Sequence, residues 1–481
     1  MTRRPLALAL LAVAAAGCGG GEDPGQRPDN RPNIVVLMTD DQTLESLRVM
    51  DGVRRTLAER GTTFTRSFVS FAMCCPSRAT FLTGQYAHNH GVLGNRPPTG
   101  GYARLDKAET LPVWLGRAGY RTMHLGKFLN RYGQDGPPTE VPPGWDEWHA
   151  SVDPLTYEYY GTMLNENGRL RTYPSQYSTD LYARRADELI ERAARDERPF
   201  FLFVGFLAPH TGGPRERDDP AGLATPAPAP RHRDRFDAEP LPPGVRAAAG
   251  ERDMSDKPAY VRARPPITPQ LAKAIEESYR QRLESLLAVD EAVVSIMRTL
   301  RAEGELDDTL VVFTSDNGFF HGEHRVPSEK MLPYEPSIRV PLIIRGPGVP
   351  AGAKRRQLVT NADLAPTILD VAAAAATKPQ DGVSLLPLLA DPQLEPERDL
   401  LIEGTGGFTV VAFDALRSHR YLYVRYVTGE RELYDLEHDP HQLRSVHDDT
   451  AYDAVEAGLA RRLRALSTCV GRRCRGATGP G

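Results

Sequence analysis

The sequence predicts an α/β fold: a large mixed, mostly parallel sheet with helices on both faces, followed by a small C-terminal α+β domain with an antiparallel sheet. Apolar runs of strand length alternate with helical patterns through most of the 481 residues, an order typical of parallel sheets. The first predicted strand, at 33–38, is almost wholly apolar, as in strands buried on both faces. Near the end of the chain, strand-like runs follow one another without intervening helices.

The elements of the large sheet follow in order from this first strand, and folding starts near Arg31. Residues 211–269 are rich in Pro, Arg and Asp with little periodicity, so we expect a long surface loop region. Such loops often form the entrance to a substrate-binding pocket. Apolar residues at three- and four-residue spacing predict a long helix at 272–302. The other predicted elements are helices at 110–118, 179–195 and 364–374 and strands at 120–124, 199–206, 309–314 and 340–345.

The N-terminus has the pattern of an export signal. Arg3 and Arg4 precede an apolar run at 6–16, which is too short to cross a bilayer. The small residues before Cys18 resemble the lipobox of bacterial lipoproteins, and the Arg pair loosely resembles a twin-arginine signal. We therefore expect an exported lipoprotein, anchored to a membrane of the bacterial cell envelope through lipid on Cys18. An ordinary secretory signal with an incidental cysteine, giving a periplasmic or extracellular protein, is the alternative.

The chain divides into a leader, a tether and two folded domains, because its length exceeds one small core. We expect a signal peptide at 1–17, a lipid-anchored tether at 18–31, a large domain at 32–390 and a small domain at 391–481. A linker at 390–397, strands at 400–403, 408–413, 421–426 and 432–436, and a helix at 452–466 are predicted around and within the small domain. Cys469 and Cys474 lie close together in the tail, and a disulfide there fits an oxidising compartment.

The overall charge gives no sign of a nucleic-acid partner. The formal net charge is −4, so the chain has no global basic field. A polyanionic substrate would therefore have to bind to a local basic patch.

Two acidic pairs follow two predicted strands. Asp40 and Asp41 come directly after the first strand, and Asp316 and Asn317 follow the strand at 309–314. The carboxyl ends of parallel strands are where such sheets bind ligands. Four hard oxygen ligands favour Ca²⁺ or Mg²⁺ over Zn²⁺. For either pair alone, a helix cap or a turn is the simpler interpretation.

The segment Cys74-Cys75-Pro76-Ser77-Arg78-Ala79-Thr80-Phe81-Leu82-Thr83-Gly84 resembles the signature of the formylglycine sulfatases, within the alkaline phosphatase superfamily. The signature is Cys-x-Pro-Ser-Arg, then three residues and Leu-Thr-Gly, and every fixed position matches. The resemblance implies that Cys74 is oxidised after translation to formylglycine by a formylglycine-generating enzyme. The hydrated aldehyde is the nucleophile in that family. We also expect Ser77 to cap the following helix, whose positive end suits a sulfate.

The resemblance covers nearly the whole chain after the leader and is closest to the N-acetylglucosamine-6-sulfatase branch. It makes 32–390 the catalytic domain and implies hydrolysis of a sulfated sugar or polysaccharide such as a glycosaminoglycan. By resemblance, one Ca²⁺ is held by Asp40, Asp41, Asp316, Asn317 and the modified Cys74. Arg78, Lys127, His210 and Lys330 would bind sulfate and handle protons. The supporting segments are 126–130, 208–210, 315–318, 330, 334–335, 340–342 and 432–436.

His210 is the preferred acid for the leaving group, since imidazole titrates near neutral pH, and Lys330 is the other candidate. Many arylsulfatases have a His two residues after the lysine that matches Lys127, but this chain has Leu129. His124 is one possible replacement as proton acceptor.

Plainer interpretations remain for other side chains. Lys127 and Lys330 can also be read as solvated surface lysines. His321 and His324 face the pocket or pack in the core, and His88 and His90 hold the loop after the signature helix.

Two competing functions stay open. A phosphonate monoester or phosphodiester hydrolase of the same fold is the first, and a catalytically inactive sulfoglycan-binding protein is the second.

Overall fold

The structure is a computed structural model that describes residues 29–475 except 218 and 407–409. The predicted signal peptide, Cys18 and most of the predicted tether lie outside the described residues. In the described part of the chain, no helix is both long enough and apolar enough to span a membrane.

A ten-stranded mixed sheet forms the centre of the molecule, in the order β11-β2-β10-β9-β1-β8-β4-β5-β6-β7. The strands are β1 (Asn33–Thr39), β2 (Thr62–Phe64), β4 (Arg121–Gly126), β5 (Glu147–Ser151), β6 (Tyr160–Glu166), β7 (Arg169–Tyr177), β8 (Phe200–Gly205), β9 (Thr309–Ser315), β10 (Leu342–Arg345) and β11 (Ala353–Arg355). β9, β1, β8, β4 and β5 run parallel to one another. This confirms the predicted mixed, mostly parallel sheet. A separate small sheet pairs β3 (Ser67–Phe68) with β12 (Val359–Thr360).

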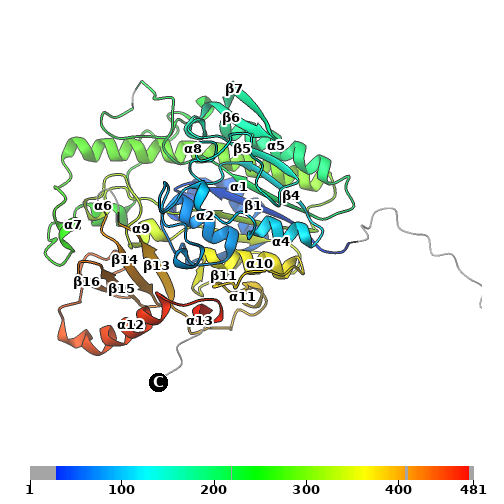
Figure 1. Ribbon diagram of the computed structural model, residues 1–481. Helices are drawn as coiled ribbons and strands as arrows, with labels where there is room; N and C mark the ends of the chain where they lie inside the picture. Colours follow the sequence, from blue (N-terminus) through cyan, green and yellow to red (C-terminus); the bar gives the residue numbers. More distant parts are fainter. Residues whose placement is uncertain (1–28, 218, 407–409, 476–481) are drawn as a thin grey trace, which may run out of the picture.

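Helices cover both faces of the large sheet (Figure 1). Ile34 and Val36 pack into one apolar core, whereas Val35 and Leu37 pack into the other, which explains why β1 is apolar throughout. The first core includes α2 (Cys74–Thr83), α4 (Leu111–Arg117), α10 (Leu364–Val371) and α11 (Leu386–Ala390); the second includes α1 (Asp51–Thr56), α5 (Ser178–Ala193) and α8 (Pro269–Ala302). Shorter helices are α3 (Ala87–His90), α6 (Pro243–Ala249), α7 (Ala259–Arg262) and α9 (Glu335–Ile338).

Some elements were not predicted. The edge strands β6 and β7 were missed, because β7 is mostly exposed and buries mainly Tyr173 and Tyr177, so it carries no apolar run. The long helix α8 starts three residues earlier than expected, at Pro269, where the Thr268 side chain accepts a hydrogen bond from the Leu271 amide. A proline in the first turn and a Thr cap are common at helix starts.

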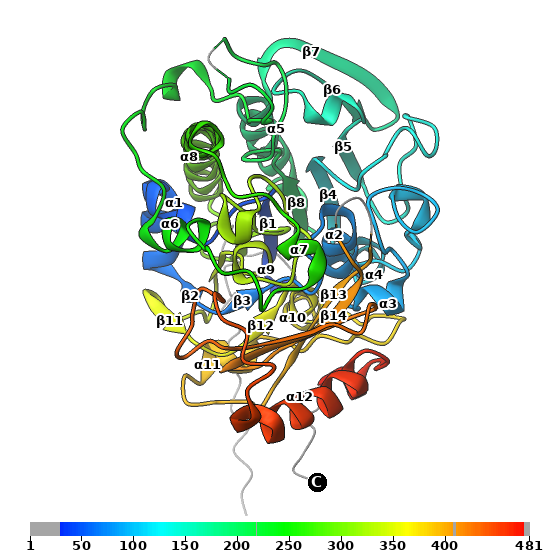
Figure 2. The same cartoon turned by 90° about the vertical axis from the view of Figure 1, so that its left-hand side faces the viewer.

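The C-terminal part is a four-stranded antiparallel sheet, as predicted, with β13 (Leu400–Gly404), β14 (Phe413–Arg417), β15 (Tyr421–Tyr426) and β16 (Arg431–Asp435). The helix α12 (Asp453–Leu466) lies against the face of this sheet that points away from the ten-stranded sheet (Figure 2). Of the strand expected at 408–413, residues 408 and 409 lie outside the described residues, and β14 begins only at the last predicted residue, Phe413. β14 pairs with β15 from Phe413↔Tyr426 to Arg417↔Leu422, and the short connection between them sets this register.

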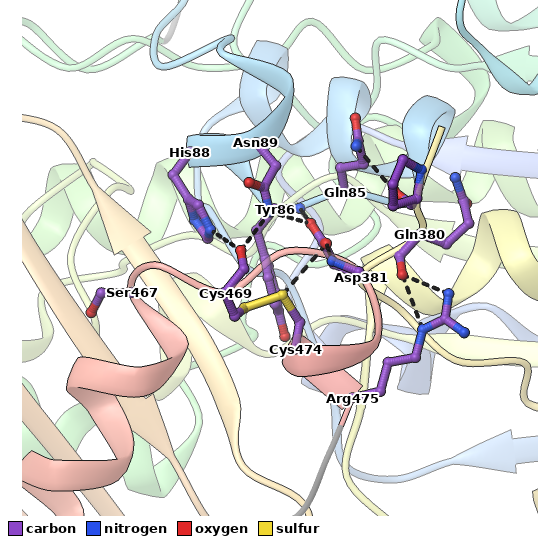
Figure 3. Close-up of a disulfide and its surroundings, with 12 residues drawn as sticks. Gln85, Tyr86, His88, Asn89, Gln380, Asp381, Ser467, Cys469, Cys474 and Arg475 are labelled. Atoms are coloured by element: carbon purple, nitrogen blue, oxygen red, sulfur yellow. Dashed lines mark hydrogen bonds between the residues drawn. A yellow bond between two sulfur atoms is a disulfide. The ribbon is translucent and has the colours of Figure 1, made fainter. Parts of the chain in front are cut away.

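The predicted disulfide between Cys469 and Cys474 is present and fixes the tail beside α3 (Figure 3). His88 Nε2 and Asn89 Nδ2 lie 2.8 and 2.9 Å from the Cys469 carbonyl oxygen. α13 (Arg472–Arg475) follows. These contacts confirm that His88 holds the loop after the signature helix, and His90 does so through Thr80 and Val92.

Candidate active site

The two predicted acidic pairs meet at the carboxyl ends of β1 and β9. The strands pair in parallel, with Thr39 opposite Ser315, so the residues that follow are neighbours. The Asp41 amide donates to Asp316 Oδ1 over 3.1 Å. Asn317 Nδ2 donates to Asp41 Oδ1 over 2.6 Å. The simpler interpretation of each pair as an isolated turn is therefore wrong.

Cys74 is the first residue of α2, which corrects the prediction that Ser77 caps this helix. The Ser77 amide already bonds the Met73 carbonyl over 3.0 Å, and Ser77 Oγ accepts from Asn361 Nδ2 over 2.9 Å. Pro76 fits within the first turn because its missing N–H would have no partner there. The positive end of the helix dipole consequently lies at Cys74.

The Cys74 side chain lies among the acidic and basic groups of the site. Its Sγ is 3.4 Å from Asp40 Oδ1 and 2.9 Å from Lys330 Nζ. Burial, reinforced by the charge of Asp40, raises the pKa of the Cys74 thiol well above its usual range. The unmodified thiol is therefore a poor nucleophile, because the thiolate is the reactive form.

Three cationic side chains from different elements surround Cys74. Lys127 hydrogen-bonds Asp40 Oδ2, and Lys330 hydrogen-bonds Asp41 Oδ1. Arg78 Nε donates to Asp316 Oδ2 over 2.7 Å, and Arg78 Nη1 donates to the Lys127 carbonyl over 2.8 Å.

Neither lysine is a solvated surface residue, since the Lys127 and Lys330 side chains are only 1% and 13% exposed. Burial alone would lower both lysine pKa values, but Asp40 raises the pKa of Lys127 and Asp41 raises that of Lys330. Both ammonium groups are therefore charged.

His210 follows β8 and points at the same site. Its Nδ1 is 2.6 Å from the Thr211 carbonyl oxygen, and its Nε2 is 3.7 Å from Asp41 Oδ2. The contact with Thr211 assigns the proton to Nδ1, which leaves Nε2 to face the site. Burial lowers the pKa of His210 to about 3, although Asp41 opposes this shift.

The predicted metal ligands fit a hard cation. Ligand atoms of Asp40, Asp41, Cys74 and His210 lie within 4.8 Å of one another, and Asp316 is bonded to Asp41 as described above. Asn317 Oδ1 is buried and has no hydrogen-bond partner among the described residues. A buried oxygen left unpaired next to carboxylates suits a cation that takes oxygen ligands.

His124 does not replace the histidine that is missing at Leu129. Its Nε2 lies 3.2 Å from the Gly126 carbonyl oxygen, and its ring packs against Phe128, Trp148 and Phe203. Burial lowers the pKa of His124 to about 3. It therefore supports the core.

His321 and His324 also lie apart from Cys74. His324 bonds Glu251, and His321 lines a different hollow together with Phe319 and Pro242.

Arg282 and Tyr157 also lie at the site, although neither was predicted from the sequence. Arg282 Nη2 donates to the Asp41 carbonyl over 2.5 Å. An available signal was its position on the apolar stripe of α8, between the buried Tyr279 and Leu286, where a charged residue needs a partner. The Tyr157 ring lies 4.8 Å from Lys127 Nζ and 5.1 Å from the His210 ring, and no pattern in the sequence distinguished it.

A hollow of about 550 Å³ opens in front of the site. His210 and Lys330 line it, with Asn95, Arg96, Asn130, Arg131, Asp153, Tyr157 and Thr405. Contrary to expectation, none of the described residues in the loop region 211–269 lines this hollow. The loop region instead contacts the C-terminal part, for example through Lys257 Nζ and the Leu443 carbonyl.

The sheet, the strand-end acidic pairs and the cations around Cys74 together define a hydrolase for anionic esters. The chain belongs to the sulfatase family: the family model described as Sulfatase matches residues 32–374. A second model, described as N-sulphoglucosamine sulphohydrolase, C-terminal, matches residues 322–468. The predicted enzyme class is thereby confirmed.

Relatives extend over most of the chain. An arylsulfatase of Volvox carteri is 33% identical over 98% of this chain and 79% of its own length. The N-acetylglucosamine-6-sulfatase of Homo sapiens is 35% identical over 83% of this chain and 71% of its own length. The predicted resemblance to the N-acetylglucosamine-6-sulfatases is confirmed.

Solved structures agree on the fold. The structure of BT4656 in complex with its substrate D-glucosamine-2-N,6-O-disulfate has a TM-score of 0.76 and 25% identity, covering 92% of this chain and 98% of that one. A phosphonate monoester hydrolase of Agrobacterium radiobacter has a TM-score of 0.65 and 23% identity, covering 91% of this chain and 95% of that one. The latter shows that the fold alone does not separate sulfate from phosphonate esters.

Proposed function

We propose that this sulfatase removes sulfate from a sulfated sugar or polysaccharide of the glycosaminoglycan type, through a formylglycine made from Cys74. One observation carries the proposal: Cys74 begins α2, carries the first position of the sulfatase signature and faces both Asp40 and Lys330. The names of the relatives support the sugar, since one acts on N-acetylglucosamine-6-sulfate by its name and another is bound to a disulfated glucosamine.

The side chains around Cys74 have distinct tasks. When formed, the formylglycine supplies a hydrated aldehyde as the nucleophile toward sulfur. Arg78, Lys127 and Lys330 place positive charge where the sulfate oxygens would lie, which stabilises charge that develops there. They are held in place by buried carboxylates, so little reorganisation is needed when the substrate arrives.

The departing sugar oxygen needs a proton, because an alkoxide is a poor leaving group. His210 presents Nε2 to the site, and Lys330 presents a charged ammonium next to Cys74. We propose His210 as the acid, with Lys330 as the second candidate. For this role His210 takes up a proton at Nε2 when the negative charge of the bound sulfate raises its pKa.

We propose Ca²⁺ as the resident cation. Asp40, Asp41, Asp316 and Asn317 would hold it, together with the group at position 74. All four side chains offer oxygen, and the unpaired Asn317 Oδ1 is the atom that most clearly lacks a partner. Such a cation would supply positive charge for the sulfate oxygens.

We also propose that the chain is exported and held at the bacterial cell envelope by lipid on Cys18, after removal of 1–17. A disulfide between Cys469 and Cys474 fits an oxidising compartment. Replacing Cys18 with Ala should move the protein from the membrane fraction to the soluble fraction, and unchanged membrane retention would contradict the anchor. The formylglycine-generating enzyme is the expected maturation partner.

The test of the sulfatase assignment compares nitrophenyl sulfate with a matched nitrophenyl phosphonate monoester on the matured enzyme. We expect kcat/KM to favour the sulfate by roughly two orders of magnitude, because a site built for one charge distribution discriminates in the transition state. Equal or reversed values would identify a phosphonate hydrolase. No turnover of either ester by protein with a formylglycine at 74 would favour the binding protein.

A further inference from the structure

A second hollow of about 550 Å³ lies at the opposite end of the sheet from Cys74. Its walls are formed by the end of α1, the 3₁₀ helix η2 (Ala58–Arg60), the end of α8 with the turn after it, and the end of β10. The lining residues are Arg55, Thr56, Arg60, Arg301, Gly304, Leu306, Asp307 and Arg345. Four arginines from four elements thus converge on one cavity.

The protein offsets the positive charge in this hollow only in part, through Asp307 beside Arg345 and through Asp290, whose pKa burial raises and the charge of Arg55 lowers in part. Arg55, Arg60 and Arg301 form no ion pair with any carboxylate in the described part of the chain. Arg345 has one partner, Asp307, at 3.8 Å, and the Asp307 side chain is 100% exposed whereas that of Arg345 is 13% exposed.

The arginines also repel one another, which agrees with an excess of positive charge in the hollow. Burial lowers the pKa of Arg345, Asp307 opposes that shift, and the charges of Arg301 and Arg60 lower the pKa further. A second arginine-lined hollow, beside Arg121 and Arg198, differs because Glu147 and Asp196 pair with those arginines.

We propose that the hollow formed by Arg55, Arg60, Arg301 and Arg345 binds a sulfate group of the polysaccharide substrate, as a docking site separate from the catalytic site. Planar guanidinium groups bind tetrahedral oxyanions through paired N–H donors. An anion bound there would offset the mutual repulsion of the four arginines. The choice of a sulfated sugar as the ligand rests on the proposed function. That the hollow binds an anion rests on its arginines alone.

The rim of the hollow favours a flexible chain over a membrane surface. Asp307 is fully exposed, and Glu303 and Asp308 are exposed beside it. Arg55, Arg60 and Arg301 are exposed as well, so a flat anionic bilayer would meet carboxylates and arginines together. A single anionic group on a sugar chain can instead contact the arginines without the carboxylates.

Because the hollow lies far from Cys74, we assign it a role in holding the polymer substrate and none in catalysis. Strands of seven residues separate it from the ends of β1 and β9, which is roughly 20 Å at 3.3 Å per residue. A sulfate bound there cannot reach Cys74, but it holds the polymer near the enzyme and raises its effective concentration at the catalytic site. Small sulfate esters should gain nothing from it.

The experiment measures binding of a heparin hexasaccharide and of its desulfated form by calorimetry, in a Cys74→Ala background that does not consume the ligand. The test variant adds Arg60→Gln and Arg301→Gln. The control adds Arg461→Gln and Arg473→Gln, two exposed arginines of the C-terminal part, so that the net charge changes equally. We expect the test pair to weaken binding of the sulfated form by about tenfold or more, since charge-assisted hydrogen bonds are removed, and the control pair to change it less than twofold.

In the matured enzyme, the Arg60→Gln and Arg301→Gln pair should leave kcat/KM for nitrophenyl sulfate unchanged. Equal weakening by both pairs, or none by either, would overturn the docking site. Arginine-dependent capture of phosphatidylglycerol vesicles by the Cys18→Ala protein, with oligosaccharide binding intact, would overturn it in favour of a membrane contact. If the oligosaccharide binds through these arginines but no sulfate ester is hydrolysed, the docking site stands and the proposed function fails.

Discussion

Lys330 Nζ lies 2.9 Å from Cys74 Sγ and also bonds the Asp41 carboxylate. The loop between β9 and α9 therefore brings a charged ammonium to the residue that starts α2. Because Asp41 in turn bonds Asn317, Lys330 and the three segments that carry the predicted metal ligands are joined through hydrogen bonds. The proximity makes Lys330, like His210, a candidate to act on the departing oxygen.

Replacing His210 with Ala separates these two candidates. If His210 protonates the leaving group, hydrolysis of a sulfated sugar should slow by on the order of 10²–10⁴-fold, whereas nitrophenyl sulfate should slow far less because nitrophenolate leaves without a proton. Steady-state rates on both substrates give the ratio. The Lys330→Met variant is the comparison, and an equal loss on both substrates for His210→Ala would transfer the acid role to Lys330.

Chelation should remove activity. The oxygen set of Asp40, Asp41, Asp316 and Asn317 suits Ca²⁺, so EDTA should abolish turnover and Ca²⁺ should restore it. Asp316→Ala should resemble the chelated enzyme, whereas the exposed Asp308→Ala should not. Full activity in protein that elemental analysis shows to be free of divalent metal would rule out the cation.

The buried pair between Arg398 and Asp363 should contribute strongly to stability. Both Arg398 Nη atoms donate to Asp363 over 2.7 Å, and the side chains are 5% and 0% exposed. Replacing Arg398 with Met leaves a buried carboxylate without its partner, which typically costs about 3–5 kcal/mol. Arg462, which is 38% exposed and pairs with Asp399 at 3.2 Å, is the control, with an expected cost of about 0–1 kcal/mol. Urea unfolding of both Met variants measures the difference, and equal costs would contradict the prediction.

Stability should fall at high pH through His88. Burial alone would lower its pKa, but the hydrogen bond with Glu403 at 2.9 Å raises the pKa of His88 to about 9. Since the unfolded value is about 6.5, the folded state binds the proton more tightly. The contribution of protonated His88 to the free energy of unfolding is therefore full below pH 6.5 and is lost as pH rises through 9.

We expect the difference in unfolding free energy between the native protein and His88→Asn to shrink by roughly 1–2 kcal/mol between pH 6 and pH 9.5, after allowance for solvent screening. Urea titrations at both pH values give it. A difference that is independent of pH would show that His88 acts only through packing.

The fold and much of the site could be predicted because their signals are local. β1 is an unbroken apolar run that ends in Asp40 and Asp41, and the parallel arrangement implies that other strand ends lie beside it. Arg282 could not be assigned a role, because its contact with Asp41 depends on how α8 packs against the sheet. The β6–β7 hairpin lies at the sheet edge, where exposed side chains leave no periodic pattern.

Ser77 illustrates a different limit. Ser is a favoured helix cap, so the sequence pointed to it, yet the helix begins three residues earlier and Asn361 binds the Ser77 hydroxyl. Asn361 is distant in sequence, and such tertiary contacts override local preference.

Mass spectrometry of the tryptic peptide 67–78, from protein made in a host with a formylglycine-generating enzyme, tests the central claim most directly. Conversion of Cys74 to formylglycine should make this peptide about 18 Da lighter, because a thiol becomes an aldehyde. After alkylation, only Cys75 should carry the label. The fraction of converted peptide should rise in proportion to sulfatase activity across preparations. A fully active enzyme whose peptide retains two alkylated cysteines would contradict the account.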